Sequence, residues 1–225
     1  MKNSNLEQIG IYLKSKGNLK QSVFQKTLSV FEALKKVIES HATKLNETCK
    51  DDLFDIEYKE NGKFEAELTF AGDALIFNMH TNVFNFPDDF FIHQSPYVLE
   101  DESRKYCGMI EIYNFLADSF KYSRYADSGY LVARIFINRE GHFFVEGEDQ
   151  LGFLYKDFDK LVINNDFLAL IIEQAMVFSI DFDLWVPKYQ EVKELTVGER
   201  IQQKGTITHK TSKRLGFSFS DEEKA

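Results

Sequence analysis

The stretch LFDIEYKENGKFEAELTFAGDALIFNMHTNVF, residues 53–84, decides the fold. Apolar and polar side chains alternate along it with a period of two, which is typical of strands that bury one face. Two turn signals interrupt the alternation, Asn61-Gly62 and then Ala71-Gly72-Asp73. The sequence therefore predicts a meander of three antiparallel strands. The side chains expected on its buried face are Phe54, Ile56, Tyr58, Phe64, Ala66, Leu68, Phe70, Leu75, Phe77, Met79, Thr81 and Val83.

Two helices are expected before this meander. Ser4 can cap a short helix that ends near Gly17, and Asn18 can cap a longer one that reaches about Thr48. Apolar residues recur on the longer helix at helical spacing and form one broad face. This face suits either a helix lying across a sheet or a dimer-forming coiled coil. Lys35 interrupts the coiled-coil seam, so the sheet-covering helix is favoured.

The segment 101–124 fits both a helix and a strand. Its apolar residues fall on one helical stripe, with Asp101 or Ser103 as a cap, whereas Ile110, Ile112 and Phe115 have β propensity. Gly108 weakens the helix. We expect a helix here.

The rest of the chain contains a hairpin and two more helices. The runs YLVARIFIN and HFFVEGE flank Arg139-Glu140-Gly141 and read as two strands. Asn165 or Asp166 can cap an apolar helix that runs to Ile180, and a capping box from Thr196 to Glu199 opens a weak helix through about Gln203.

Together these elements predict an α+β fold, with an antiparallel sheet of about five strands, a three-strand meander plus a hairpin, packed against long helices. The expected organisation is a short N-terminal helix over residues 1–17, one α+β domain over 18–203, and a mobile tail over 204–225 that is first basic and then acidic. The order helix, three strands, helix, two strands, helix resembles the type III secretion chaperone-like fold. That resemblance implies a domain, often a homodimer, that holds a segment of a client protein without catalysis.

Composition limits the partners and the compartment. A net charge of -9 disfavours nonspecific binding to nucleic acid or to anionic membranes. Cys49 and Cys107 have no zinc spacing, and the N-terminus lacks the apolar run of a signal peptide, so a cytoplasmic protein is expected. The most apolar window, 167–180, is too short to cross a bilayer.

Few residues suggest chemistry. His80, Asp88, Asp89 and His93 lie within sixteen residues, but their spacing is not that of metal ligands, so no metal is expected. Glycine-rich phosphate loops, nucleophile elbows and HExxH are missing from the sequence, and no cofactor is expected. Cys107 is more simply a small buried thiol than a nucleophile. The pair Asp181 and Asp183 is more simply solvated than catalytic.

Two functions stay open. The first is a non-enzymatic, chaperone-like module, with a homodimer as its candidate form, that binds an unidentified protein client through sheet edges or apolar grooves. The second is a small-molecule or enzymatic pocket on a polar sheet face, lined by Asn78, His80, Asn82, Arg134 and His142. The basic tail residues Lys204, Lys210, Lys213 and Arg214 are either solvated or form an arm that contacts phosphate groups.

Overall fold

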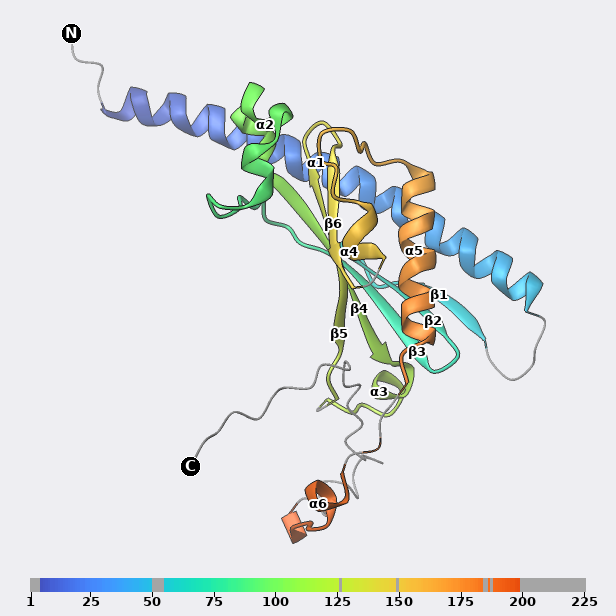
Figure 1. The fold of residues 1–225 in the computed structure, drawn as a ribbon. Coiled ribbons are helices and arrows are strands. Elements are labelled where there is room, and N and C mark those ends of the chain that lie inside the picture. The colour runs from blue at the N-terminus through green and yellow to red at the C-terminus, as the bar shows by residue number, and fades with distance from the viewer. Residues whose placement is uncertain are drawn as a thin grey trace.

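A six-stranded antiparallel sheet forms the centre of the protein, and two helices, α1 (Asn5–Thr48) and α5 (Asn165–Ile180), cover one of its faces (Figure 1). The computed structural model describes residues 5–49, 55–125, 127–148, 150–183, 186 and 188–198. The predicted α+β class is confirmed. The strands follow one another in chain order, and each pairs with the next. They are β1 (Ile56–Glu60), β2 (Glu65–Phe70), β3 (Asp73–Met79), β4 (Cys107–Leu116), β5 (Tyr130–Asn138) and β6 (Phe143–Gly147).

The predicted meander forms as β1 to β3, although Thr81 and Val83, which were expected on its buried face, lie beyond the end of β3. Leu68 pairs with Leu75, and Ala66 pairs with Phe77, so the apolar residues of β2 and β3 share the face that packs against α1 and α5. Gly62 has a φ of 102° in the first turn, which glycine adopts without steric cost. That turn is wider than the two-residue hairpin that Asn61-Gly62 predicts, because Asn61 N–H donates to Glu65 O and no positive φ occurs at Asn61.

Helix α1 is continuous, and the predicted break near Gly17 is wrong. A single glycine costs a helix only about 1 kcal/mol, and the flanking leucines and lysines are good helix formers. Two contacts fix the far end of α1 to the edge strand β1. Lys35 Nζ lies 2.6 Å from Glu60 Oε1, and the side-chain amide of Asn46 bonds the backbone of Ile56 through both its oxygen and its nitrogen. Because Asn46 occupies these edge groups, it replaces part of a neighbouring strand.

The helix expected over 101–124 is wrong, because residues 107–116 form the strand β4 near the middle of the sheet. Ile110 and Ile112 are buried against the helices, while Cys107 and Met109 are buried on the opposite face. A strand buried on both faces has a nearly continuous apolar run, which periodicity does not separate from a buried helix. The sheet therefore has six strands rather than five, and the helix on which the chaperone-like resemblance depends is replaced by a strand.

The segment between β3 and β4 covers one end of the opposite sheet face. It contains the short helices η1 (Phe91–Gln94), α2 (Pro96–Glu100) and η2 (Glu102–Lys105). Phe86 packs against Phe136 and Phe144, with ring centroids 5.1 and 5.4 Å apart. The rest of this second apolar cluster is Phe84, Phe90, Ile92, Tyr97, Val98, Cys107, Met109 and Phe158. Only this end of the face is covered by that cluster.

Shorter helices complete the described chain: α3 (Ala117–Lys121), α4 (Leu151–Leu154) and α6 (Tyr189–Val192). The N-cap of α5 is Asn164, whose side chain accepts from Phe167 N–H, one residue before the predicted cap. Three predicted features lie outside the described residues: the cap at Ser4, the end of the helix after Thr196, and the tail 204–225. Within the described ranges, no helix is both long and apolar enough to span a membrane.

Gly108 distinguishes the observed strand from the predicted helix. A Cβ at this position would lie 2.8 Å from the Cβ of Thr27 on α1, which is closer than carbon atoms pack. We expect Gly108→Ala to lower the free energy of unfolding by about 1–3 kcal/mol through overpacking. In a helix the same change would raise it by about 1 kcal/mol. Urea denaturation measures the sign, and Gly72→Ala, where a Cβ meets nothing within 4 Å, is the control.

Candidate functional site

The five residues of the predicted sheet-face pocket do not lie in one cavity. Asn78 and Arg134 lie on the sheet face that the helices leave free, on strands β3 and β5. Each of them pairs with Glu111 of β4, so they are two strands, or about 10 Å, apart. Arg134 is held by Glu146, with 2.5 Å between Nη2 and Oε2. The row of polar residues across β3 to β6 is an open surface rather than a closed pocket. Its members are Asn78, Glu111, Arg134 and Glu146.

His80 and Asn82 lie beyond the end of β3. The backbone N–H of Asn82 donates to His80 Nδ1 over 3.1 Å, and the His80 ring lies edge-on to Phe84 with centroids 4.8 Å apart. His93 is elsewhere, with its Nε2 3.2 Å from the carbonyl oxygen of Phe86. Among the described residues, no three histidine, cysteine or carboxylate side chains gather as a metal would require.

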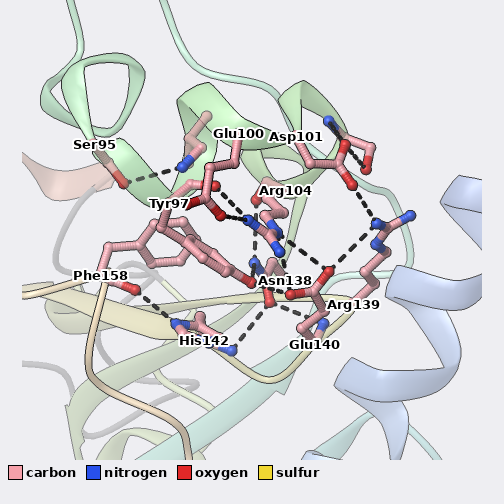
Figure 2. A network of polar contacts seen from close by, with 12 residues as sticks. Ser95, Tyr97, Glu100, Asp101, Arg104, Asn138, Arg139, Glu140, His142 and Phe158 are labelled. Carbon is pink, nitrogen blue, oxygen red and sulfur yellow. Dashed lines mark hydrogen bonds and ion pairs between the residues drawn. The ribbon is translucent and has the colours of Figure 1, made fainter.

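His142 belongs to a polar network that ties the β3–β4 segment to the β5–β6 hairpin (Figure 2). The Tyr97 ring stacks on the His142 ring, with centroids 4.0 Å apart. The Arg104 guanidinium lies 4.2 Å from the centroid of the Tyr97 ring. Tyr97 Oη donates to Glu140 Oε2 over 2.6 Å. His142 Nδ1 also lies 2.9 Å from the carbonyl oxygen of Phe158. We call Tyr97, Arg104, Asn138, Glu140 and His142 the clamp.

Asn138 is the centre of the clamp and is fully buried. Its Oδ1 accepts from the backbone N–H groups of Glu140 and His142, at 2.9 and 3.0 Å. Its Nδ2 donates to Tyr97 Oη and to the carbonyl oxygen of Arg104, at 3.0 and 3.2 Å. The amide therefore shapes the hairpin turn and holds the preceding segment at the same time. Both the oxygen and the nitrogen of this buried amide therefore have all their hydrogen-bond partners, as a buried polar group needs if it is to stabilise a fold.

The electrostatics of the clamp favour a structural role. Burial, followed by the hydrogen bond to Glu140, raises the pKa of Tyr97 above its usual 10. The hydrogen bond from Tyr97, followed by Arg104 and Arg139, lowers the pKa of Glu140 below its usual 4.5. A general acid or base works best with a pKa near the operating pH, and both of these shifts move away from neutrality. Tyr97 thus stays protonated and Glu140 stays ionised near neutral pH.

The structure also shows the surroundings of the other candidate reactive residues, Cys107 and the pair Asp181 and Asp183. Cys107 is fully buried in the second apolar cluster, where burial raises the pKa of its thiol and so disfavours the nucleophilic thiolate. Asp181 caps the end of α5, and Asp183 is exposed two residues later, so the pair follows a helix and not a strand.

The sequence reasoning missed an exposed apolar face on the N-terminal turns of α1. The N-terminal turns of α1 project past the sheet (Figure 1), and they leave the side chains of Leu6, Ile9 and Leu13 78%, 51% and 66% exposed. Leu6, Gly10, Leu13 and Gly17 follow one another at spacings of four, three and four, so they form one stripe. This spacing was the available signal, but an exposed stripe and a buried one look the same in sequence.

The stripe leads into a groove of about 620 Å³ between α1 and the segment after β3. The helix side of the groove consists of Gly17, Lys20, Gln21 and Phe24, and the other side is residues 81–84. Its wall is apolar at Phe24, Val83 and Phe84 and polar elsewhere. We call the stripe and the groove together the contact face. Of the predicted pocket residues, Asn82 alone lines this groove.

Comparisons with protein-family models, with curated proteins and with solved structures gave no match to this chain. The type III secretion chaperone-like resemblance therefore stays a prediction. The functional argument depends on the geometry of the chain itself.

The clamp can be tested by removing one hydroxyl group. We expect Tyr97→Phe to lower the free energy of unfolding by about 1–3 kcal/mol, because Glu140 and the buried Asn138 amide each lose a partner. Tyr122→Phe, at an exposed ring, is the control and should change little. Equal unfolding curves for Tyr97→Phe and the natural protein would contradict the clamp.

The same variant has an expected pH dependence. Because the folded-state pKa of Glu140 is lowered, its stabilisation is complete above the usual value of 4.5 and is lost as the pH falls through the lower folded value. The difference in unfolding free energy between the natural protein and Tyr97→Phe should therefore be larger at about pH 7 than at about pH 3. A difference that grows toward low pH would contradict the assignment.

A metal test addresses the stretch from Asn78 to His93. We expect elemental analysis of the purified protein to find no stoichiometric zinc or iron, because His80 and His93 bond to backbone groups of their own segments. A reproducible one-to-one metal content that disappears in His80→Ala or His93→Ala would overturn this expectation.

Proposed function

We propose that this chain is a non-enzymatic, chaperone-like protein-binding module that acts in the cytoplasm without a cofactor and docks a protein client on the contact face. One observation carries the proposal: the helix continues for several turns beyond the sheet with large apolar side chains exposed. Leu6 and Leu13 lie on the stripe, Ile9 lies beside it, and Ile11 and Tyr12 lie on other sides. Contiguous apolar surface of this kind marks sites of protein or membrane contact.

Helix energetics support the same function. The N-terminal turns propagate from the packed part of α1 and need no nucleus of their own, but packing supplies most of the stability of a helix. Residues 5–15 are all exposed, so the fold buries none of them. A partner that buries Leu6, Ile9 and Leu13 would contribute about 1.5–3 kcal/mol for each fully buried side chain. The N-terminal turns thus gain their stability on binding.

The groove extends the apolar stripe and supplies polar contacts for orientation. Phe24, Val83 and Phe84 form its apolar wall, and Lys20, Thr81 and Asn82 offer donors and acceptors beside it. An amphipathic helix that docks by residues at helical spacing needs this combination of apolar pockets and a polar rim.

Substitutions on the stripe test the proposal against a matched control. Leu13→Asp places a charge on the stripe, whereas Ile11→Asp places it on another side of the helix at an equally exposed position, 67% against 66%. Both should leave the melting temperature nearly unchanged, because exposed sites tolerate substitution. We expect the natural protein and Ile11→Asp to retain the same proteins, additional copies of the chain included, in affinity capture with mass spectrometry.

We expect Leu13→Asp to lose these proteins. The proposal is wrong if all three forms retain the same set, since binding would then use another surface. It is also wrong if none retains any protein, including its own copy, above an unrelated control.

A further inference from the structure

We infer that the C-terminal segment 210–219 of this chain docks on the open face of its own sheet. The open face is the part of the sheet surface opposite α1 and α5 that the second apolar cluster leaves uncovered. The segment itself lies outside the described residues, and its sequence is basic first and apolar next. This docking is independent of the contact face, which lies on α1 and on the residues after β3.

The strands of the open face carry more carboxylates than cations. The two cations are Lys59 and Arg134, and each engages a carboxylate on an edge strand. Lys59 Nζ lies 2.8 Å from Glu57 Oε2 on β1. Arg134 Nη2 lies 2.5 Å from Glu146 Oε2 on β6. Three carboxylates of this face are left with no described cation at ion-pair distance: Glu65, Glu67 and Glu111.

These three carboxylates lie together around Asn78. Glu65 of β2 and Glu111 of β4 each pair with Asn78 of β3, so they are about 10 Å apart. Glu67 follows Glu65 two residues along β2, on the same face. Their described hydrogen-bond donors are all uncharged, the side chains of Asn61, Thr69 and Tyr113. A cation placed over Asn78 would therefore be attracted to all three carboxylates.

An apolar row lies beside the carboxylates. Ile76 of β3 pairs with Glu67 of β2 and with Tyr113 of β4. Tyr113 in turn pairs with Leu131 of β5, which is 37% exposed. Neither core cluster of the described residues includes Ile76, Tyr113 or Leu131. These side chains gain free energy when another apolar group covers them.

The segment 210–219 carries the complementary chemistry in the same order. Its cations are Lys210, Lys213 and Arg214, with no acid between them. At every second position there follow Leu215, Phe217 and Phe219, so an extended segment shows them on one side. The cations match the unpaired carboxylates, and the apolar side chains match the row beside them. Exposed ion pairs contribute little each, so the apolar contacts supply most of the affinity and the charges fix the placement.

The chain approaches this face from the end of α5. The Phe182 ring lies 5.5 Å from the ring of Tyr130, which begins β5 next to Leu131. Helix α6 lies beyond the same end of the sheet (Figure 1). An extended chain spans up to about 40 Å from residue 198 to residue 210, whereas the six strands are only about 24 Å across. The link is therefore long enough for the segment to lie on the open face.

Cross-linking in the full-length chain tests this docking. In a Cys49→Ser background, which removes the exposed thiol and leaves Cys107 buried, Ser212→Cys is combined with Asn78→Cys and treated with a short bismaleimide. Ser40→Cys, at an exposed position of α1 on the other side of the sheet, replaces Asn78→Cys in the control. Each rate is divided by the reactivity of the same thiol toward a monofunctional maleimide. We expect a product of one chain mass that forms at least about tenfold faster at position 78 than at position 40, because docking raises the effective concentration there.

Charge reversal identifies the contact. Lys213→Glu with Arg214→Glu should abolish the preference for position 78, and Glu65→Lys with Glu67→Lys should do the same. All four changes together should restore the preference, because the ion pairs form again with their signs exchanged. Lys224→Glu, which lies outside the segment, is the control and should leave the preference unchanged. Rising salt should weaken the preference in the natural sequence.

Three results would overturn the docking. The first is equal normalised rates at positions 78 and 40, and the second is a preference that survives Lys213→Glu with Arg214→Glu, or that the fourfold variant fails to restore. The third is a product of twice the chain mass, which would place the segment of a second copy on the face. Melting temperatures of the tail variants should equal that of the natural protein, so a lost preference does not come from unfolding.

Discussion

The mismatch between the length of α1 and the width of the sheet determines the rest of the structure. A helix of 44 residues is about 66 Å long, whereas six strands place the outer two only about 24 Å apart. The sheet can therefore cover only part of the helix. The buried residues of α1 run from Val23 to Ala42, and the turns before them extend past the sheet with their apolar stripe uncovered. Because the end of α1 is fixed at Asn46 and Lys35, the excess length all lies at the N-terminal side.

The second layer of contacts shapes the groove. The clamp holds Tyr97 and Arg104 to the β5–β6 hairpin, and Phe84 exchanges backbone hydrogen bonds with Cys107, so the chain between these points stays against β4. Residues 81–84 are thereby placed opposite α1, where they form the outer wall of the groove. His142, a candidate pocket residue in the sequence, helps to position this segment through its contacts with Tyr97 and with the carbonyl oxygen of Phe158. The buried amide of Asn138 therefore affects the contact face from a distance.

Local signals predicted the parts of the fold that depend on one periodicity. Alternation with turns identified β1 to β3 and the β5–β6 hairpin, and helical spacing identified α1 and α5. They failed at β4, because burial on both faces removed the alternation, and at Gly17, because the cost of one glycine is small beside the good helix formers around it. The pocket residues were assigned to a common face correctly only for Asn78 and Arg134. The contact face escaped prediction, since exposure depends on the width of the sheet, which no local pattern contains.

Hydrogen exchange along α1 tests the central claim most directly, namely that the overhanging turns form a binding surface that association covers. The amides of residues 9–15 have helical acceptors and belong to exposed residues, so slower exchange with a partner present reports on association. We expect these amides to be protected in the complex with a captured partner, approaching those of residues 23–42, and to lose that protection without the partner and in Leu13→Asp. Exchange at the same rate with and without the partner would contradict the claim.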